Sequence, residues 1–320
     1  MNSIVISGHN GFIGSSLTSR LKKFNIIGIS DKKRKKEKNV TSIVKNVNKV
    51  NNTDVKHSFQ TLIHLAAVSD ISFCNANPKT CYEVNVNGTN KMLEIARKND
   101  ANIIFASSSH VYGNPIKLPI KENFPLSATN PYGRSKLIIE NFLQDVFISD
   151  DSWHIALLRY FNPVGAHKSG LIGEDPNGVP NNLMPYISQV ATGKLEKLSV
   201  FGGDYNTPDG TGVRDYIHVV DLAKGHVKAL QVLENRPQIL TVNLGTGKGY
   251  SVLDMIKTFK KISGMNVPYE IVGRRPGDIA SCYMDSSTAE KLLGWKAELG
   301  IDEMCKDMWR WQLSNPNGYF

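Results

Sequence analysis

Short apolar runs alternate with amphipathic stretches through the first two thirds of this 320-residue chain. Repetition of strand, helix and strand favours parallel strands whose two faces are both covered by helices. The pattern predicts an α/β protein with a doubly wound parallel sheet, the Rossmann arrangement. The strands are expected at 3–7, 26–30, 61–65, 102–107 and 154–160, and the helices at 12–24, 79–98 and 134–147.

After residue 160 the chain becomes rich in Gly, Pro and Asn, at 162–182, 201–212, 245–249 and 273–278. Long connections of this kind are typical of binding surfaces. A helical pattern at 219–234 and an apolar run at 240–243 are expected to rejoin the sheet. We therefore predict a dinucleotide-binding domain of residues 1–163 plus about 214–243. A smaller, discontinuous α/β substrate domain would contain 164–213 plus 244–320.

Charge gives the first indication of partners. The chain has 38 Lys and Arg against 29 Asp and Glu, a net charge of +9. The run Lys32–Lys38 contributes +5 of this (six basic residues, one acidic), and we interpret it as a solvated loop. The excess therefore lies mainly in one loop, and no nucleic-acid partner is predicted.

The cysteines and the apolar runs bear on the compartment. The four cysteines form no Cys-x-x-Cys pair, so neither a zinc site nor any other metal site is expected. The residues at the first strand show neither a charged n-region nor a long apolar region, so no signal peptide is expected. No apolar run reaches the roughly 18 residues of a membrane span. We predict no membrane association and a cytoplasmic location.

A glycine-rich turn follows the first predicted strand and opens the first helix. It contains Gly8, Gly11 and Gly14 at three-residue spacing. Such a turn needs glycine because a positive φ and close approach of a pyrophosphate both exclude a Cβ. Asp31 ends the second strand, where a carboxylate accepts hydrogen bonds from ribose hydroxyls and repels a 2′-phosphate. The combination predicts NAD rather than NADP.

Three residue types suggest proton-transfer chemistry. Tyr132 and Lys136 are spaced i, i+4 at the start of a helix, so they share one face. A nearby ammonium and a nicotinamide charge would both favour the phenolate, which makes Tyr132 a candidate base. Ser107, Ser108 and Ser109 follow a strand at the edge where ligands of open α/β sheets bind.

Longer motifs match one family in detail. The segments 159–167 (RYFNPVGAH), 173–176 (GEDP), 180–186 (PNNLMPY), 209–218 (DGTGVRDYIH) and 274–278 (RRPGD) resemble the UDP-glucose 4-epimerase (galactose epimerase) family of the extended short-chain dehydrogenase/reductase superfamily. The match weakens at about 32–56. The resemblance implies reversible inversion at C4 of a UDP-hexose by way of a 4-keto sugar, with tightly bound NAD and a homodimer.

The resemblance also implies site residues. The implied catalytic residues are Ser108, Tyr132 and Lys136. The implied cofactor residues are Gly8, Gly11, Phe12, Ile13, Gly14, Asp31, Leu65, Ala66, Ala67, Asn85, Ser107, Tyr132, Lys136 and Tyr160. The implied substrate residues are Ser108, Tyr132, Phe161, Asn162, Asn182, Leu183, Leu198, Phe201, Arg214, Arg275, Asp278 and Cys282.

Several positions depart from the family pattern. Cys282 occupies a position beside the sugar's C2 substituent, where family members with a tyrosine resemble enzymes restricted to UDP-Glc and UDP-Gal. Because cysteine is small, the resemblance predicts that UDP-GlcNAc and UDP-GalNAc are accepted as well. Ser69 replaces a lysine near the cofactor. Asn46 and Val47 are the candidates for the adenine pocket. His110 stands where related dehydratases have an acid.

Two alternatives remain open. Another nucleotide-sugar enzyme of the superfamily, a dehydratase or decarboxylase, would share most of these motifs. A non-catalytic member that binds RNA or a protein partner would share the fold alone. The sequence does not distinguish galactose metabolism from polysaccharide biosynthesis.

Overall fold

The structure is a computed structural model that describes residues 2–32, 38–176, 178–235, 237–275 and 277–319. Most of the basic run Lys32–Lys38 therefore lies outside the described residues. Within them, seven parallel strands form one sheet in the order β10-β6-β5-β4-β1-β2-β3. The predicted doubly wound parallel sheet is confirmed. The strands are β1 (Ser3–Ser7), β2 (Asn25–Ser30), β3 (Val40–Val44), β4 (Thr61–His64), β5 (Asn102–Ser108), β6 (His154–Tyr160) and β10 (Gln238–Leu244).

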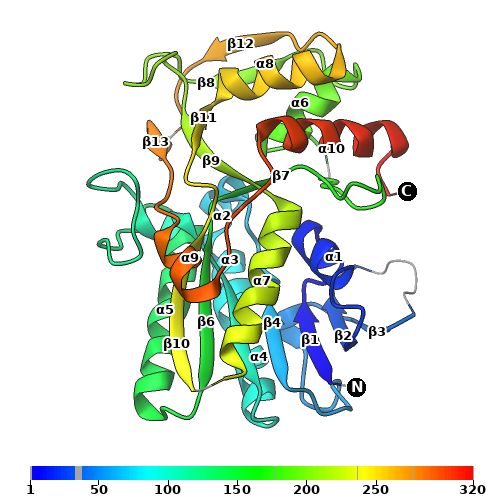
Figure 1. Cartoon of the computed structure of the whole chain (residues 1–320), viewed down its shortest axis with the longest axis vertical. Helices are drawn as coiled ribbons and strands as arrows, with labels where there is room; N and C mark the ends of the chain where they lie inside the picture. Colours follow the sequence, from blue (N-terminus) through cyan, green and yellow to red (C-terminus); the bar gives the residue numbers. More distant parts are fainter. Residues whose placement is uncertain (1, 33–37, 177, 236, 276, 320) are drawn as a thin grey trace.

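Both faces of this sheet are covered, because successive residues of each strand point to opposite sides. In β1, Ile4 and Ile6 pack with one layer of helices and Val5 packs with the other. α1 and α7 lie on the first face, and α4 and α5 on the second (Figure 1). The helices of this lobe are α1 (Phe12–Thr18), α2 (Ile71–Ala76), α3 (Pro78–Tyr82), α4 (Gly88–Arg97), α5 (Pro131–Ser149), α7 (Val219–Leu233) and α9 (Ser287–Leu293).

One predicted helix differs from the observed elements. The sequence pattern predicts a single helix over 79–98, but the chain forms α3, a π-helical turn η2 (Glu83–Asn87) and then α4. Asn85 lies in this turn, where its amide accepts a hydrogen bond from the Val68 N–H at 2.7 Å and donates to the Val68 carbonyl at 3.0 Å. The turn thus connects the helix to the loop that follows β4. This contact joins residues far apart in the sequence, so the hydrophobic periodicity of the helix does not predict it.

A smaller lobe lies beyond the carboxyl ends of the parallel strands (Figure 1). Its buried core includes Met184, Val200, Phe259 and Trp311. Its elements are β7 (Asn162–Val164), α6 (Leu183–Ala191), β8 (Leu198–Phe201), β9 (Val213–His218), β11 (Gly249–Ser251), α8 (Val252–Ser263), β12 (Tyr269–Val272), β13 (Ser281–Cys282) and α10 (Ile301–Ser314). The larger lobe also contains two short 3₁₀ turns, η1 (Val47–Lys49) and η3 (Ser109–Tyr112).

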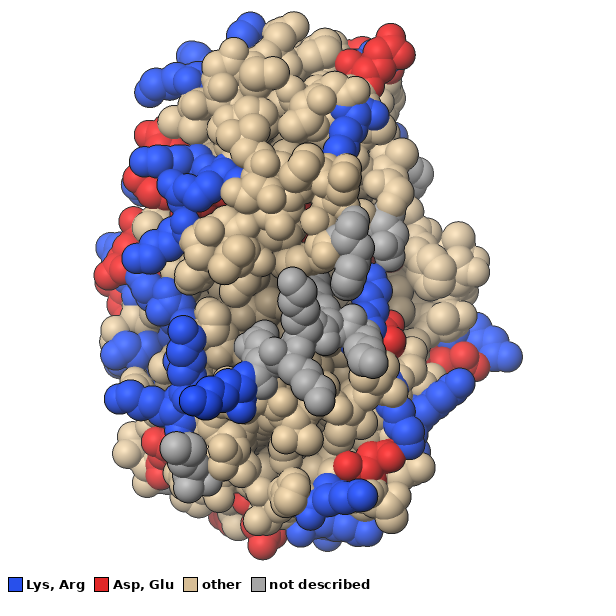
Figure 2. Space-filling view, turned by 90° about the vertical axis from the view of Figure 1, so that its right-hand side faces the viewer, with Lys and Arg blue, Asp and Glu red and all other residues tan. Residues whose placement is uncertain are grey.

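The surface carries both signs of charge. On the face shown in Figure 2, Lys and Arg side chains gather in a column along one edge, with Asp and Glu among them. Among the described residues, no helix combines the length and the apolar character that crossing a bilayer demands.

Candidate active site

The glycine turn between β1 and α1 is packed tightly against the rest of the larger lobe. Gly8 has φ +77°, and a Cβ on it would lie 2.9 Å from the Ala66 backbone nitrogen. A Cβ on Gly14 would lie 2.2 Å from the Gly8 carbonyl oxygen. Gly11 is extended (φ −73°, ψ 175°) and caps the start of α1. The turn therefore has the form of a backbone cradle in which side chains are excluded, as a pyrophosphate requires.

A cavity of about 740 Å³ begins at this turn and extends between the two lobes. It brings most of the predicted site residues together. The predicted cofactor residues in its wall are Gly8, Gly11, Phe12, Ile13, Gly14, Asp31, Leu65, Ala66, Ala67, Tyr132 and Tyr160. The predicted substrate residues in its wall are Ser108, Tyr132, Phe161, Asn162, Asn182, Leu183, Leu198, Phe201, Arg214, Arg275, Asp278 and Cys282. Asn46 and Val47 line it on the side of Asp31.

Three predicted residues lie behind this wall. Asn85 supports the 66–68 loop through its bonds to Val68 and donates to Ser135 Oγ at 2.9 Å. Lys136 donates from Nζ to the Ala106 carbonyl at 2.8 Å. Ser107 donates to the buried carboxylate of Glu140 rather than facing the cavity.

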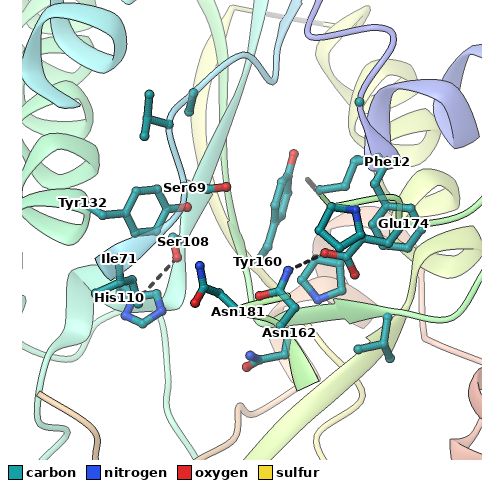
Figure 3. A pocket seen from close by; sticks show the side chains of 18 of the residues that line it. Phe12, Ser69, Ile71, Ser108, His110, Tyr132, Tyr160, Asn162, Glu174 and Asn181 are labelled. Atoms are coloured by element: carbon teal, nitrogen blue, oxygen red, sulfur yellow. Dashed lines mark hydrogen bonds between the residues drawn. The ribbon is translucent and has the colours of Figure 1, made fainter. Parts of the chain in front are cut away.

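Tyr132 is at the first turn of α5, and Ser108 ends β5 on the same side of the cavity (Figure 3). Burial raises the pKa of Tyr132 to about 12, while a hydrogen bond shared with the Ser108 hydroxyl lowers it. The His110 N–H donates to Ser108 Oγ at 3.3 Å, and the His110 ring meets the Tyr132 ring edge-on at 5.7 Å. The Ser108 hydroxyl and the Tyr132 phenol therefore lie in the same part of the cavity wall.

Lys136 lies one turn further along α5 and is buried. Its Nζ stands 4.8 Å from the centroid of the Phe105 ring and 5.9 Å from that of Tyr132. Burial lowers the pKa of Lys136 to about 8, because an ammonium loses hydration there. Burial also lowers the pKa of His110 to about 4, so this ring is neutral near pH 7.

The far end of the cavity carries the two predicted arginines. Arg214 donates from its Nη1 to the carbonyls of Val213 (2.9 Å) and Ile279 (2.8 Å). Arg275 donates from Nε to Asp278 at 3.0 Å, and its guanidinium lies 4.7 Å from the centroid of the Phe201 ring. Arg214 Nη2 also lies 3.9 Å from the Asp278 carboxylate, so two guanidinium groups share one acid and leave this end of the pocket net positive, as a diphosphate needs.

Cys282 lies on β13, in a small cluster of buried residues with Tyr112 and Phe161, and is 7% exposed. Burial raises the pKa of its thiol to about 11, with a hydrogen bond to Ser109 acting the other way. The side chain is therefore a small, uncharged part of the cavity wall.

Sequence reasoning missed several wall residues, among them Glu174, Asn181 and Tyr205. Glu174 stands opposite Tyr132 (Figure 3) and accepts a hydrogen bond from the Asn182 amide. Burial raises the pKa of Glu174 to about 7, and this hydrogen bond lowers it. Its place in the Gly-Glu-Asp-Pro motif was a signal that could have identified it.

Comparison with known proteins agrees with this geometry. The family described as "NAD dependent epimerase/dehydratase family" matches residues 4–245. The chain belongs to that family.

Within it, the resemblance to UDP-glucose 4-epimerases is confirmed. The chain is 55% identical over 271 residues to the UDP-glucose 4-epimerase of Bacillus subtilis, a match covering 84% of this chain and 80% of that protein. It is 53% identical over 266 residues to the human UDP-glucose 4-epimerase, covering 82% and 76%.

Solved structures show the same fold. The UDP-glucose 4-epimerase of Bifidobacterium longum, in complex with NAD⁺ and UDP, superposes with a TM-score of 0.94 at 44% identity, over 99% of this chain and 100% of that one. The UDP-Glc/GlcNAc 4-epimerase of Campylobacter jejuni superposes with a TM-score of 0.83 at 29% identity, over 98% and 100%.

Proposed function

We propose that this protein catalyses the reversible C4 epimerisation of UDP-glucose and UDP-galactose with tightly bound NAD. One observation carries the proposal: a single cavity joins a glycine cradle, the Ser108–Tyr132 pair and a two-arginine end. That arrangement matches the ligands of the Bifidobacterium longum relative, NAD⁺ and UDP.

The glycine cradle fits a dinucleotide, because Gly8 and Gly14 leave no room for side chains between the turn and its neighbours. We assign cofactor binding to Gly8, Gly11, Phe12, Ile13, Gly14, Asp31, Leu65, Ala66, Ala67, Tyr132, Lys136 and Tyr160. Asn85 and Ser107 would act from behind the wall. When bound, NAD would supply a hydride acceptor and donor for C4 of the sugar.

The chain's own residues move the proton. Tyr132 accepts the proton of the 4-hydroxyl, directly or through Ser108, and returns it after the 4-keto sugar has turned over. Lys136 supplies positive charge beside Tyr132. Arg214 and Arg275 hold the diphosphate, so the sugar can rotate while the nucleotide stays bound. The remaining substrate contacts are assigned to Phe161, Asn162, Asn182, Leu183, Leu198, Phe201, Asp278 and Cys282.

We further propose that the N-acetylated substrates UDP-GlcNAc and UDP-GalNAc are accepted. Support comes from Cys282, whose short side chain lines the cavity beside Ser109. The Campylobacter jejuni enzyme is described as acting on both UDP-Glc and UDP-GlcNAc.

Further parts of the proposal concern the domains, the oligomeric state and the compartment. We propose a cofactor domain (1–163 plus about 214–243) and a substrate domain (164–213 plus 244–320), although β9 lies in the smaller lobe and α9 packs in the larger one. A homodimer is supported by exposed apolar side chains on α2 and α5, which are Phe73 (42% exposed), Ile138 (45%), Phe142 (42%) and Ile148 (80%).

The four cysteines are free thiols, which suits a cytoplasmic protein.

The test is to incubate the purified protein with UDP-galactose or UDP-GlcNAc, without added NAD, and to follow the products by NMR and mass spectrometry. We expect the 4-epimer at unchanged mass. The matched variant Y132F should lose about 10²- to 10⁴-fold in rate while retaining its NAD. A product lighter by one water would indicate a dehydratase, and loss of CO₂ from UDP-glucuronic acid, assayed in parallel, would indicate a decarboxylase. An NAD-loaded protein that leaves both sugars unchanged would overturn the proposal.

A further inference from the structure

A buried ion pair lies behind the part of the cavity wall that Ser108 and Tyr132 form. The Arg159 guanidinium donates to both carboxylate oxygens of Glu140, from Nη2 at 2.6 Å and from Nε at 3.0 and 3.2 Å. The two side chains are only 3% and 0% exposed. Ser107 also donates its hydroxyl to this carboxylate. Desolvating two charges is costly, so the pair needs a reason beyond a single salt bridge.

Glu140 belongs to a row of residues on the buried face of α5. Tyr132, Lys136 and Glu140 follow one another at four-residue spacing, which places them on one side of the helix. Opposite them lies the end of β5, residues 106–108. Lys136 bonds the first of these strand residues and Glu140 bonds the second, while the third, Ser108, lines the cavity together with Tyr132. Two successive strand residues are thus tied by hydrogen bonds to two successive turns of the helix.

The surroundings of the Lys136 ammonium are mostly uncharged. Cys74 of α2 and Cys81 of α3 face it, and so does His64 of β4. Burial raises the pKa of the Cys74 thiol and lowers that of His64 to about 3, so both are neutral near pH 7. On its own helix Lys136 faces Tyr132 and Glu140. Burial has the largest effect on the pKa of Lys136 and lowers it, while Cys81, then the carboxylate of Glu140, and then Cys74 raise it.

Arg159 is itself held by other hydrogen bonds, so it restrains the Glu140 carboxylate. From Nη1 it also donates to the Tyr112 hydroxyl at 2.8 Å and to the Glu122 carbonyl at 2.9 Å. Its guanidinium lies 4.9 Å from the centroid of the Tyr112 ring. The ion pair is therefore anchored on the side away from the cavity, and Glu140 presents a fixed oxygen to the strand.

We propose that Glu140 is a positioning residue for the epimerisation: its carboxylate bonds Ser107, holds the strand end that carries Ser108, and places a negative charge one helical turn from the Lys136 ammonium. The inference rests on the proposed function and deepens it, because it assigns a role to a residue that does not touch the substrate.

The charge is tested by NMR of the full-length protein labelled with ¹³C-lysine, in which the Lys136 signal is assigned by its loss in K136R. We expect E140Q to lower the midpoint of the Lys136 titration by about one pH unit, whereas E140D, which keeps the charge, retains the wild-type midpoint. Because E140Q leaves Arg159 unpaired, the double variant E140Q/R159Q is measured as well. A wild-type midpoint in both Gln variants would overturn this half of the proposal.

The strand contact is tested with S107A, which removes the hydroxyl but keeps both charges. We expect about a tenfold loss in kcat with an unchanged KM and an unchanged Lys136 midpoint. A wild-type kcat would overturn this half. The lysine titration needs no turnover, so a lowered midpoint in a protein that epimerises nothing would reject the proposed function and leave the assignment of Glu140 intact.

Discussion

Tyr132 and Lys136 lie one turn apart on the buried face of α5, yet the Lys136 ammonium donates to the Ala106 carbonyl at 2.8 Å and stands 5.9 Å from the Tyr132 ring centroid. Burial moves the two pKa values in opposite directions, to about 12 for the phenol and about 8 for the ammonium. Both shifts favour the uncharged form. Burial thus opposes the phenolate that the sequence predicts, and we expect the charge of a bound nicotinamide to be needed besides that of Lys136.

The lowered pKa of Lys136 predicts a pH dependence. The ammonium is present below about pH 8 and is lost as the pH rises through that value. If this charge supports catalysis, kcat/KM should fall through a single-proton limb near pH 8. K136R keeps its charge at all accessible pH values, so its rate should be lower but without that limb. Profiles of kcat/KM from pH 6 to 10 for the wild type and for K136R test this. An identical fall near pH 8 in K136R would show that another group causes it.

The parts of the site that could be predicted are those set by local geometry. Gly8 and Gly14 are required by one turn, and the spacing of Tyr132 and Lys136 follows from one helix. The parallel sheet followed from alternating apolar runs. β3 (Val40–Val44) was not predicted, because only two of its five residues are even partly buried and its apolar pattern is weak.

Other features depend on contacts between distant segments. Three serines at the end of β5 could be recognised in the sequence, but strand alternation turns Ser107 toward Glu140 while Ser108 faces the cavity. Which serine faces which side is set by how β5 and α5 pack. Glu174 was missed for another reason: its motif was recognised, but its place in the cavity wall and its bond to Asn182 depend on the path of an irregular loop.

Two neighbouring arginines offer a matched test of the diphosphate site. Arg275 lines the cavity, whereas Arg274 pairs with Asp204 at 2.8 Å and stacks on Tyr205. A charge-assisted hydrogen bond is worth about 1.5–3 kcal/mol, so R275A should raise KM for UDP-galactose by about 10- to 100-fold. R274A should change KM little. Steady-state kinetics and UDP binding by calorimetry measure the difference, and equal effects of the two variants would count against a diphosphate role for Arg275.

Two variants of the glycine turn distinguish a glycine that folding requires from a glycine that NAD binding requires. A Cβ on Gly14 would lie 2.2 Å from a backbone oxygen, so G14A should destabilise the protein by about 1–3 kcal/mol. A Cβ on Gly11 would meet its nearest atom at 3.2 Å, so G11A should fold with a nearly wild-type Tm. If the pyrophosphate lies over Gly11, G11A should nevertheless retain much less NAD. Thermal melting and the nucleotide released on denaturation test this, and full NAD content in G11A would place the pyrophosphate elsewhere.

Cys282 provides the test of substrate range. Its thiol is small and 7% exposed in the cavity wall, so a tyrosine would extend into the space beside Ser109. A steric cost of about 1–3 kcal/mol against the 2-acetamido group would lower kcat/KM for UDP-GlcNAc by about 10- to 100-fold in C282Y. UDP-galactose lacks that group and should be converted almost normally. C282S keeps a small side chain and should retain both activities. If C282Y loses both activities equally, at a wild-type Tm, Cys282 does not set the selectivity for the C2 substituent.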